Sequence, residues 1–347
     1  MSIEIVFYPK TATQDDLKGH LVNLGFQPCE NLMNWTKGSM HFSWFEEKDY
    51  KSFDGVEATI FPKSSEENSK YPGSTVALHT RTRASASVVD RLFQNSVIKT
   101  ARMKFKGDFI NDWHGKNRYI PEYPDKQDEV ARGIYLLYEG VIRNIKAVKV
   151  ALPDPMLKKF KNSQLDSKFD DTKWSNFIKS IDPTLVLYNA LIPFAVAAVE
   201  HFFKQSFKIL LKYDKQAQNH LTEQTQKVEM VDVIAISKGE KTLEDIIADR
   251  YSFQNISSIH KAFHEWFKID FFGLIRKRKK IGKRIHILEK KFEEVINFRH
   301  GVTHEFRVNS DLSKEELQEM LQFAVVLIDI FVKEIKKRRG FPILIDS

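Results

Sequence analysis

Cysteine is nearly absent from this sequence, since Cys29 is the single one among 347 residues. One thiol cannot form a disulfide within the chain, and a four-cysteine zinc site is excluded. Scarcity of cysteine is typical of proteins from reducing, intracellular compartments. We therefore expect a cytoplasmic protein without structural disulfides.

The sequence also lacks a long hydrophobic run and a recognisable leader. Its N-terminus, MSIEIVFYPK, alternates like a strand and has neither a basic segment nor a long apolar one, so we expect no signal peptide. The most apolar stretch, 185–199, is shorter than the roughly 20 residues that span a bilayer. Asn189 and Pro193 interrupt it. We expect it to form a buried core helix of a soluble protein, with no membrane partner.

Acidic residues are fewer than basic ones, which gives a net charge of +8 and a pI near 9.2. This excess is compatible with a polyanionic partner such as RNA, although it says nothing about fold. The length favours two domains, and a hydrophobic fraction of 42% is enough for ordinary globular cores.

Residues 1–150 have the pattern of a small mixed α/β domain whose role the sequence does not reveal, with sensing and RNA binding as the two candidates. Thr13 and Ser87 are placed to cap its first two helices, and Gly25 to end the first. Alternation and helical spacing predict strands at 3–8, 40–45, 56–61 and 74–81 and helices at 13–25, 87–101 and 129–148.

A polar segment, 151–181, opens with the helix-breaking ALPDP and is interpreted as a linker. From Asp182 onward, in 182–347, the pattern is almost wholly helical, with Asp182 as a cap and Pro183 at the first helical position. Further helices are predicted at 242–250, 256–268, 284–300 and 313–338. The fold class is therefore α+β, with a mixed α/β domain followed by an all-α bundle.

Arg299 stands where the predicted helix 284–300 should bury apolar side chains. Leu288, Phe292, Val295 and Arg299 share one helix face. Burying a guanidinium without a partner costs several kcal/mol, which implies an internal carboxylate, another subunit or an anionic ligand. We expect Gly301 to weaken or end the helix and to let His304 fold back toward Arg299.

Two other interpretations of these residues remain open. Arg299 and His300 could complement the helix dipole, or Arg299 could pair with Glu200. His300 and His304, like His260 and His264, have the i, i+4 spacing of zinc ligands. The glutamate that follows the first histidine in HExxH is missing, however, and we expect neither a metal nor another cofactor.

The hexapeptide RHGVTH, 299–304, resembles the arginine–polar–x3–histidine motif of the HEPN superfamily, a ribonuclease-rich group of small helical domains. The order of helices over roughly 182–339 also resembles HEPN domains: a long first helix carrying Glu200, the segment NISSIHKAFHEWFKID, the motif helix and a long terminal helix. Residues 1–150 resemble no family in this way.

The resemblance implies a metal-independent endoribonuclease that uses the ribose 2′-hydroxyl as nucleophile and leaves a 2′,3′-cyclic phosphate. His304 would transfer protons and Arg299 would bind the phosphate, tasks that suit imidazole and guanidinium groups. His300 would orient the phosphate or a neighbouring residue. Glu200 and Asn297 are candidate supporting residues, although Asn297 could equally be solvated. The resemblance further implies a homodimer that joins two motifs, and a toxin-like or antiviral role in which an antitoxin or regulatory protein is a further partner.

A basic run, RKRKKIGKR, lies just before the motif helix and could bind the RNA backbone, or else form a solvated loop or helix face. The segment DWHGKNRY, 112–119, could stack bases on aromatic rings, or else form a packed loop. The alternative functions are a non-catalytic HEPN module that binds RNA, nucleotide or protein, and a metal-dependent hydrolase. The predicted RNA-binding residues are Arg276, Lys277, Arg278, Lys279, Lys280, Lys283 and Arg284.

Overall fold

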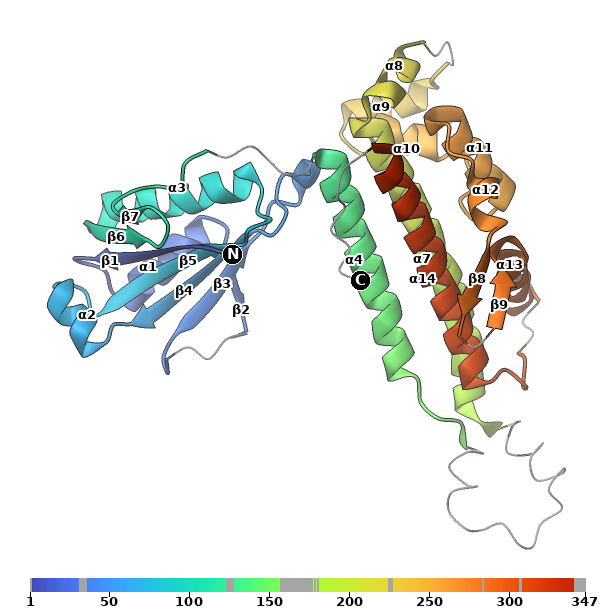
Figure 1. The fold of residues 1–347 in the computed structure, drawn as a ribbon, viewed down its shortest axis with the longest axis horizontal. Coiled ribbons are helices and arrows are strands. Elements are labelled where there is room, and N and C mark those ends of the chain that lie inside the picture. Colours follow the sequence, from blue (N-terminus) through green and yellow to red (C-terminus); the bar gives the residue numbers. More distant parts are fainter. Residues whose placement is uncertain are drawn as a thin grey trace, which may run out of the picture. The chain divides into compact units, whose positions relative to one another are not determined.

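The structure, a computed structural model, describes residues 2–30, 36–122, 128–156, 177, 179, 181–223, 227–282, 284–305 and 308–339. The chain divides into two compact units, Met1–Arg132 and Gly133–Ser347. The first is built on an antiparallel sheet and the second is mostly helical (Figure 1), which confirms the predicted α+β class. Domain limits at 150 and 182 stay a prediction, because most of 151–181 lies outside the described residues.

The first unit contains a seven-stranded sheet with the order β2-β3-β4-β5-β1-β6-β7, in which all neighbours are antiparallel. Strands β2, β6 and β7 were not predicted; they are short or lie in glycine-containing polar segments with weak alternation. The strands are β1 (Ile3–Pro9), β2 (Gln27–Cys29), β3 (Met40–Trp44), β4 (Val56–Pro62), β5 (Val76–Thr82), β6 (Gly107–Asn111) and β7 (Gly115–Lys116).

Helices α1 (Gln14–Asn23) and α3 (Val88–Phe105) cover one face of this sheet and enclose its apolar core with Phe7, Leu78 and Phe109. The predicted caps are confirmed, since the side chains of Thr13 and Ser87 accept from backbone N–H groups in capping boxes. Two short elements complete the unit: the 3-10 helix η1 (Lys48–Tyr50) and α2 (Ser65–Lys70).

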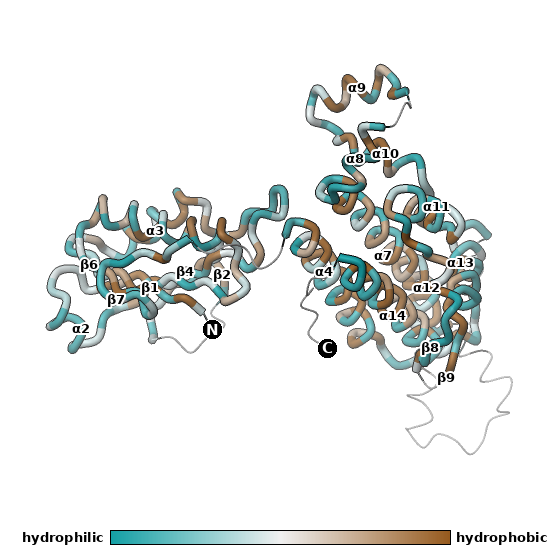
Figure 2. The backbone as a smooth tube through the Cα atoms, turned by 45° about the horizontal axis from the view of Figure 1, so that its top comes forward, coloured by the Kyte–Doolittle hydropathy of each residue, from teal (hydrophilic) through white to brown (hydrophobic). Residues whose placement is uncertain are grey.

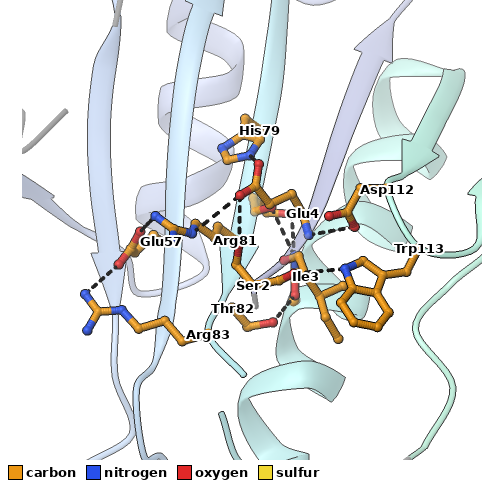
Figure 3. A network of polar contacts seen from close by, with 12 residues as sticks. Ser2, Ile3, Glu4, Glu57, His79, Arg81, Thr82, Arg83, Asp112 and Trp113 are labelled. Carbon is orange, nitrogen blue, oxygen red and sulfur yellow. Dashed lines mark hydrogen bonds and ion pairs between the residues drawn. The ribbon is translucent and has the colours of Figure 1, made fainter. Parts of the chain in front are cut away.

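The other sheet face carries a polar network that links neighbouring strands (Figure 3). Glu4 lies 3.0 Å from Nε2 of His79 and 3.6 Å from Nε of Arg81, which also pairs with Glu57 at 3.6 Å. Burial lowers the pKa of His79 and so favours the neutral imidazole. The network therefore joins β1, β4 and β5 by polar contacts on the side opposite to the core.

The second unit is organised around α7 (Pro183–Tyr213), a largely hydrophobic helix (Figure 2) that contacts helices throughout the unit. Asp182 accepts from the backbone N–H of Thr184, which confirms the predicted cap. The other elements are α4 (Glu129–Ala151), α8 (Lys215–Glu223), α9 (Met230–Ser237), α10 (Leu243–Ala248), α11 (Ile256–Phe267), α12 (Phe271–Ile275), β8 (Arg278–Ile281), β9 (Arg284–Ile287), α13 (Leu288–His304) and α14 (Lys314–Arg339).

Aromatic packing fixes α7 within the unit. Phe203 of α7 lies against Phe263, Phe271 and Phe331, with ring centroids 5.0 to 5.9 Å apart in edge-on arrangements that aromatic rings favour. By length and composition alone α7 could cross a membrane, and 44% of its most apolar window is buried inside the protein. Contacts with α14, α13 and α10 give it the position of a central helix.

Two expectations about the motif helix were wrong. The segment 284–287 forms β9 rather than the start of the helix, because Arg284–Ile287 pairs with β8. The helix also continues through Gly301 to His304, and the N–H of Glu305 still donates to the carbonyl of Gly301. Glycine in a helix is less favourable than alanine by about 1 kcal/mol. The neighbouring turns of α13 outweigh this cost.

Candidate functional site

Helix α13 places the motif residues along a partly buried face of the helical unit. Leu288, Phe292 and Val295 are buried, and the ring of Phe292 packs near Phe323 of α14 at 5.9 Å. Arg299 follows Val295 by four residues and is half-buried. The apolar row thus anchors α13 and directs Arg299 toward the segment between α10 and α11.

Arg299 is connected to Glu200 through Gln254. Nη1 of Arg299 donates to Oε1 of Gln254 at 3.1 Å, and Nε2 of Gln254 donates to Oε2 of Glu200 at 2.7 Å. The three residues come from α13, from the segment before α11 and from α7. The pairing of Arg299 with Glu200 that the sequence allowed is therefore indirect, through one amide.

The amide of Gln254 matches the charges on both sides of it. Its carbonyl oxygen faces the guanidinium and its NH₂ group faces the carboxylate, so the reversed amide would place like polarities together. Among the described residues, Arg299 uses one of its five N–H donors in this contact. The remaining donors can bind an anion while Gln254 holds the side chain in place.

His300 and His304 lie on a different face of α13 from Arg299. Their rings are 4.7 Å apart and both residues are exposed. An α-helix turns by about 100° per residue, so side chains five residues apart point about 140° away from each other. In a continuous helix His304 therefore does not fold back onto Arg299 of the same chain, contrary to our expectation.

The remaining predicted supporting residue, Asn297, is exposed on α13, and no hydrogen bond of its side chain occurs within the described part of the chain. Thr303, which the sequence did not single out, donates from Oγ1 to the carbonyl of Arg299 at 2.8 Å. That contact belongs to the helix and adds no group to the site.

The basic run forms a β-hairpin rather than a loop or helix face. Strand β8 pairs with β9, and Gly282 adopts φ 59° at the turn, a conformation that glycine reaches without strain. Lys283 lies outside the described residues. We call the following residues the basic hairpin; their side chains are all exposed: Arg276, Lys277, Arg278, Lys279, Lys280 and Arg284.

Two contacts hold the basic hairpin on the helices. Ile281 is fully buried, and Nε2 of His286 lies 2.9 Å from Oε1 of Glu319 on α14. The same carboxylate is 3.7 Å from Nζ of Lys291. Arg299 lies eleven residues beyond the first residue of α13, about 16 Å along the axis. A bound strand that contacts both the hairpin and Arg299 would have to extend over several nucleotides.

The histidine pairs do not join a larger ligand set. Within the described ranges, no group of three or more His, Cys, Asp or Glu side chains is arranged to hold a metal ion. His260 and His264 stack at 5.2 Å on α11, and Nδ1 of His260 is 3.7 Å from Asp270. These pairs are therefore explained as ring and ion-pair contacts on helix surfaces.

Gln254 is the site residue that sequence reasoning missed. It lies in the short segment YSFQN between two helices, where no periodicity identifies which side chains point inward. Its partners are 45 and 54 residues away in the chain, and the packing of α10, α11 and α13 against α7 brings them together. The one indication in the sequence that Gln254 points inward was its position next to Phe253, an aromatic residue that is buried.

Comparison with known proteins identifies the helical unit. No curated protein and no solved structure matches the chain. The sequence model of the RiboL-PSP-HEPN family matches residues 157–337, just over half of the chain, and includes α7, α13 and α14 up to residue 337. The protein therefore belongs to the RiboL-PSP-HEPN family, and its helical unit is a nuclease or RNA-related module.

Proposed function

We propose that the helical unit is a metal-independent endoribonuclease that cleaves RNA at the Arg299–His304 motif. The observation that carries the proposal is the motif on α13, where Gln254 holds a guanidinium that keeps further donors for an anion. His304 is exposed and therefore accessible to a substrate. Family membership gives RNA as the expected substrate class.

In the proposed reaction, a general base removes the proton from the 2′-hydroxyl. The 2′-oxygen then attacks phosphorus, the bond from phosphorus to the 5′-oxygen breaks, and that oxygen takes a proton from a general acid. The products are a 2′,3′-cyclic phosphate and a 5′-hydroxyl. His304 supplies base and acid because imidazole gains and loses protons near neutral pH. Arg299 stabilises the additional negative charge on the phosphoryl oxygens.

The diverging directions of Arg299 and His304 support a site shared between two copies of the chain. One chain alone does not bring the two groups to one phosphate, whereas a symmetric dimer can bring Arg299 and His304 of both copies to one shared cleft. The second histidine would then serve as the acid when the first is the base. His300, which stacks on His304, would keep that ring in place.

The biological role that we propose is that of a toxin-like or antiviral effector in the cytoplasm, controlled by an antitoxin or regulatory protein. RNA cleavage without strong base contacts would damage many transcripts, and such an activity needs a partner to restrain it. The basic hairpin suits this role, since cations that contact phosphates bind RNA irrespective of sequence.

One observation favours the second candidate, a non-catalytic module that binds RNA, nucleotide or protein. Arg299 already has an internal partner in Gln254, so its half-buried position does not by itself require a substrate phosphate. In that case the hairpin would bind the ligand and the motif would serve packing. The two functions differ in whether bound RNA is cut.

The deciding experiment incubates purified protein with total RNA and with a defined oligonucleotide, in excess EDTA and in its absence. The proposal expects cleavage in both conditions and products whose 3′ ends resist labelling until the cyclic phosphate is opened and the resulting phosphate is removed. Binding without cleavage would establish the second function. Loss of cleavage in EDTA, restored by zinc, would instead establish a metal-dependent hydrolase.

A further inference from the structure

The first unit contains a basic pocket on the helix-covered side of its sheet, in a region outside the family match. Its volume is about 560 Å³, within the range of small-molecule sites. Lys10 follows β1, Lys99 and Arg102 come from α3, and Lys106 links α3 to β6. Tyr119 and Met103 complete much of the wall. Cations from three parts of the unit thus converge on one hollow.

Hydrogen bonds and one close approach hold the backbone that carries these cations. The N–H of Lys10 lies 3.2 Å from the carbonyl oxygens of both Phe105 and Lys106, which ties the end of β1 to the end of α3. Gly107 has φ 122°, and a Cβ atom there would lie 2.1 Å from the carbonyl oxygen of Tyr8. The close approach fixes the link between α3 and β6, so the pocket exists before a ligand binds.

Among the described residues, no carboxylate forms an ion pair with the cations of the pocket, although the charge of Asp108 interacts with that of Arg102. Asp108 lines the pocket, but it pairs with Lys116 at 2.8 Å and accepts from Asn117 at 2.9 Å. In the described part of the chain, no ion pair involves Lys10, Lys99, Arg102 or Lys106. A pocket in which four cations outnumber one carboxylate, itself paired with Lys116, concentrates anions.

The dipole of α3 explains only part of this arrangement. Lys99, Arg102 and Lys106 lie near the C-terminal end of the helix, where cations are favoured. Lys10 follows β1, however, and the dipole of α3 does not account for its position beside three other positive charges, which repel it. Arg102, 5.7 Å from the ring centroid of Phe109, is positioned by that ring, which also packs against Tyr119 at 4.8 Å. Four converging cations are therefore better explained by an anionic ligand.

We propose that this pocket binds the phosphate groups of a single-stranded RNA, as a second contact in addition to the basic hairpin. Guanidinium and ammonium groups are the side chains that hold phosphates. Tyr119 supplies an aromatic wall against which a base can pack. A free nucleotide offers the same phosphate chemistry, so the test has to separate the two sources.

The test measures binding of a 2′-O-methyl RNA oligonucleotide to the full chain by fluorescence anisotropy at several salt concentrations. This ligand has no attacking hydroxyl, so binding is measured whether or not the protein is a nuclease. The variant is Lys99→Gln with Arg102→Gln. Its control, Lys48→Gln with Lys51→Gln, removes the same charge from exposed positions at η1.

We expect the pocket variant to reduce the slope of log affinity against log salt by about 1.4, from roughly 0.7 per lost phosphate contact, and the control to leave the slope unchanged.

Titration with AMP identifies whether the phosphate bound in the pocket comes from RNA or from a free nucleotide. Loss of AMP binding in the pocket variant, with an unaltered RNA slope, would assign the site to a free nucleotide phosphate. Equal RNA slopes in both variants together with unchanged AMP binding would overturn the proposal. Far-UV circular dichroism checks that the helix content of the variant is unchanged. Lys106→Gln repeats the measurement at a position outside α3.

Discussion

At the scale of single residues, the site depends on how one half-buried arginine is held. Arg299 and Glu200 are both partly buried and carry opposite charges, and Gln254 bridges them with one hydrogen bond to each. Removing a bridging partner leaves the remaining polar groups without their hydrogen bonds, a loss that usually exceeds the value of the bonds themselves.

Gln254→Ala should therefore lower the stability of the helical unit by about 1 kcal/mol, near the lower end expected for half-buried groups. Cleavage should fall mainly through kcat, because Arg299 would lose its fixed orientation while the hairpin still binds RNA. Urea unfolding and single-turnover kinetics measure the two effects. Gln216→Ala, at an exposed position of α8, is the control, and equal behaviour of both variants would remove Gln254 from a positioning role.

His304→Ala tests the proton transfer assigned to the motif. Cleavage should decrease by about 10²- to 10⁴-fold, the usual contribution of a general acid or base. The fold should be retained because His304 is exposed near the end of α13. His264→Ala replaces another exposed histidine, on α11, and should leave the rate unchanged. Undiminished cleavage by His304→Ala would exclude the residue from the mechanism.

At the scale of helices and strands, the caps and the hydrophobic spacing were sufficient to predict most elements. Thr13, Ser87 and Asp182 begin helices because their side chains satisfy backbone N–H groups at the first turn. The basic hairpin could not be predicted in this way. Ile281, at its turn, is the one fully buried side chain among the described residues of 276–284, and the basic residues around it show no alternation of apolar and polar side chains. The continuity of α13 through Gly301 could not be predicted from the low helix propensity of glycine, because the neighbouring turns of the helix outweigh it.

Neutral replacement of Arg276, Lys277, Arg278, Lys279 and Lys280 tests the hairpin as an RNA contact. Affinity for single-stranded RNA should fall, and the salt slope should decrease by up to about 3.5, from roughly 0.7 for each of five phosphates. Ile281 is kept, so the hairpin stays anchored on α14. An unchanged slope would assign the run to a solvated surface without a role in binding.

The packing of α10 against α7 should depend on pH, because Asp245 of α10 forms an ion pair with Lys208 of α7. Its partial burial acts to raise the pKa, but the hydrogen bond from Lys208 and those from Thr242 outweigh this and lower the pKa to about 2. The ordinary value is 3.8, so the folded state favours the ionised form. The resulting stabilisation is complete above about pH 4 and is lost as the pH falls toward 2.

Urea unfolding of wild type and Asp245→Asn from pH 6 to pH 2 measures this contribution. The difference between the two proteins should be largest near neutral pH and should vanish at the acidic end. Glu240→Gln, an exposed neighbour, should show no such convergence. A gap that stays constant over the whole range would show that Asp245 contributes through its shape and hydrogen bonds rather than its charge.

At the scale of the whole molecule, the proposed activity requires two copies of the chain. Arg299 and His304 are about 140° apart around α13, so a single copy does not bring both groups to the same phosphate, and a complete site would need the motifs of two copies in one cleft. Two copies that meet across this helix would supply two arginines and two histidines. The arginines would repel each other, and each has a link through Gln254 to Glu200 that offsets part of the repulsion.

Arg299→Ala should therefore abolish cleavage while the dimer remains intact, or becomes tighter without RNA because the repulsion is removed. Analytical ultracentrifugation measures the assembly, and cleavage of a labelled RNA measures the activity. Mixing the variant with wild type under conditions that allow subunit exchange should lower activity more than dilution does, since each mixed dimer has an incomplete site. A fully active monomer at the assay concentration would contradict a shared site, and the Gln254 contact would then be the main role of Arg299.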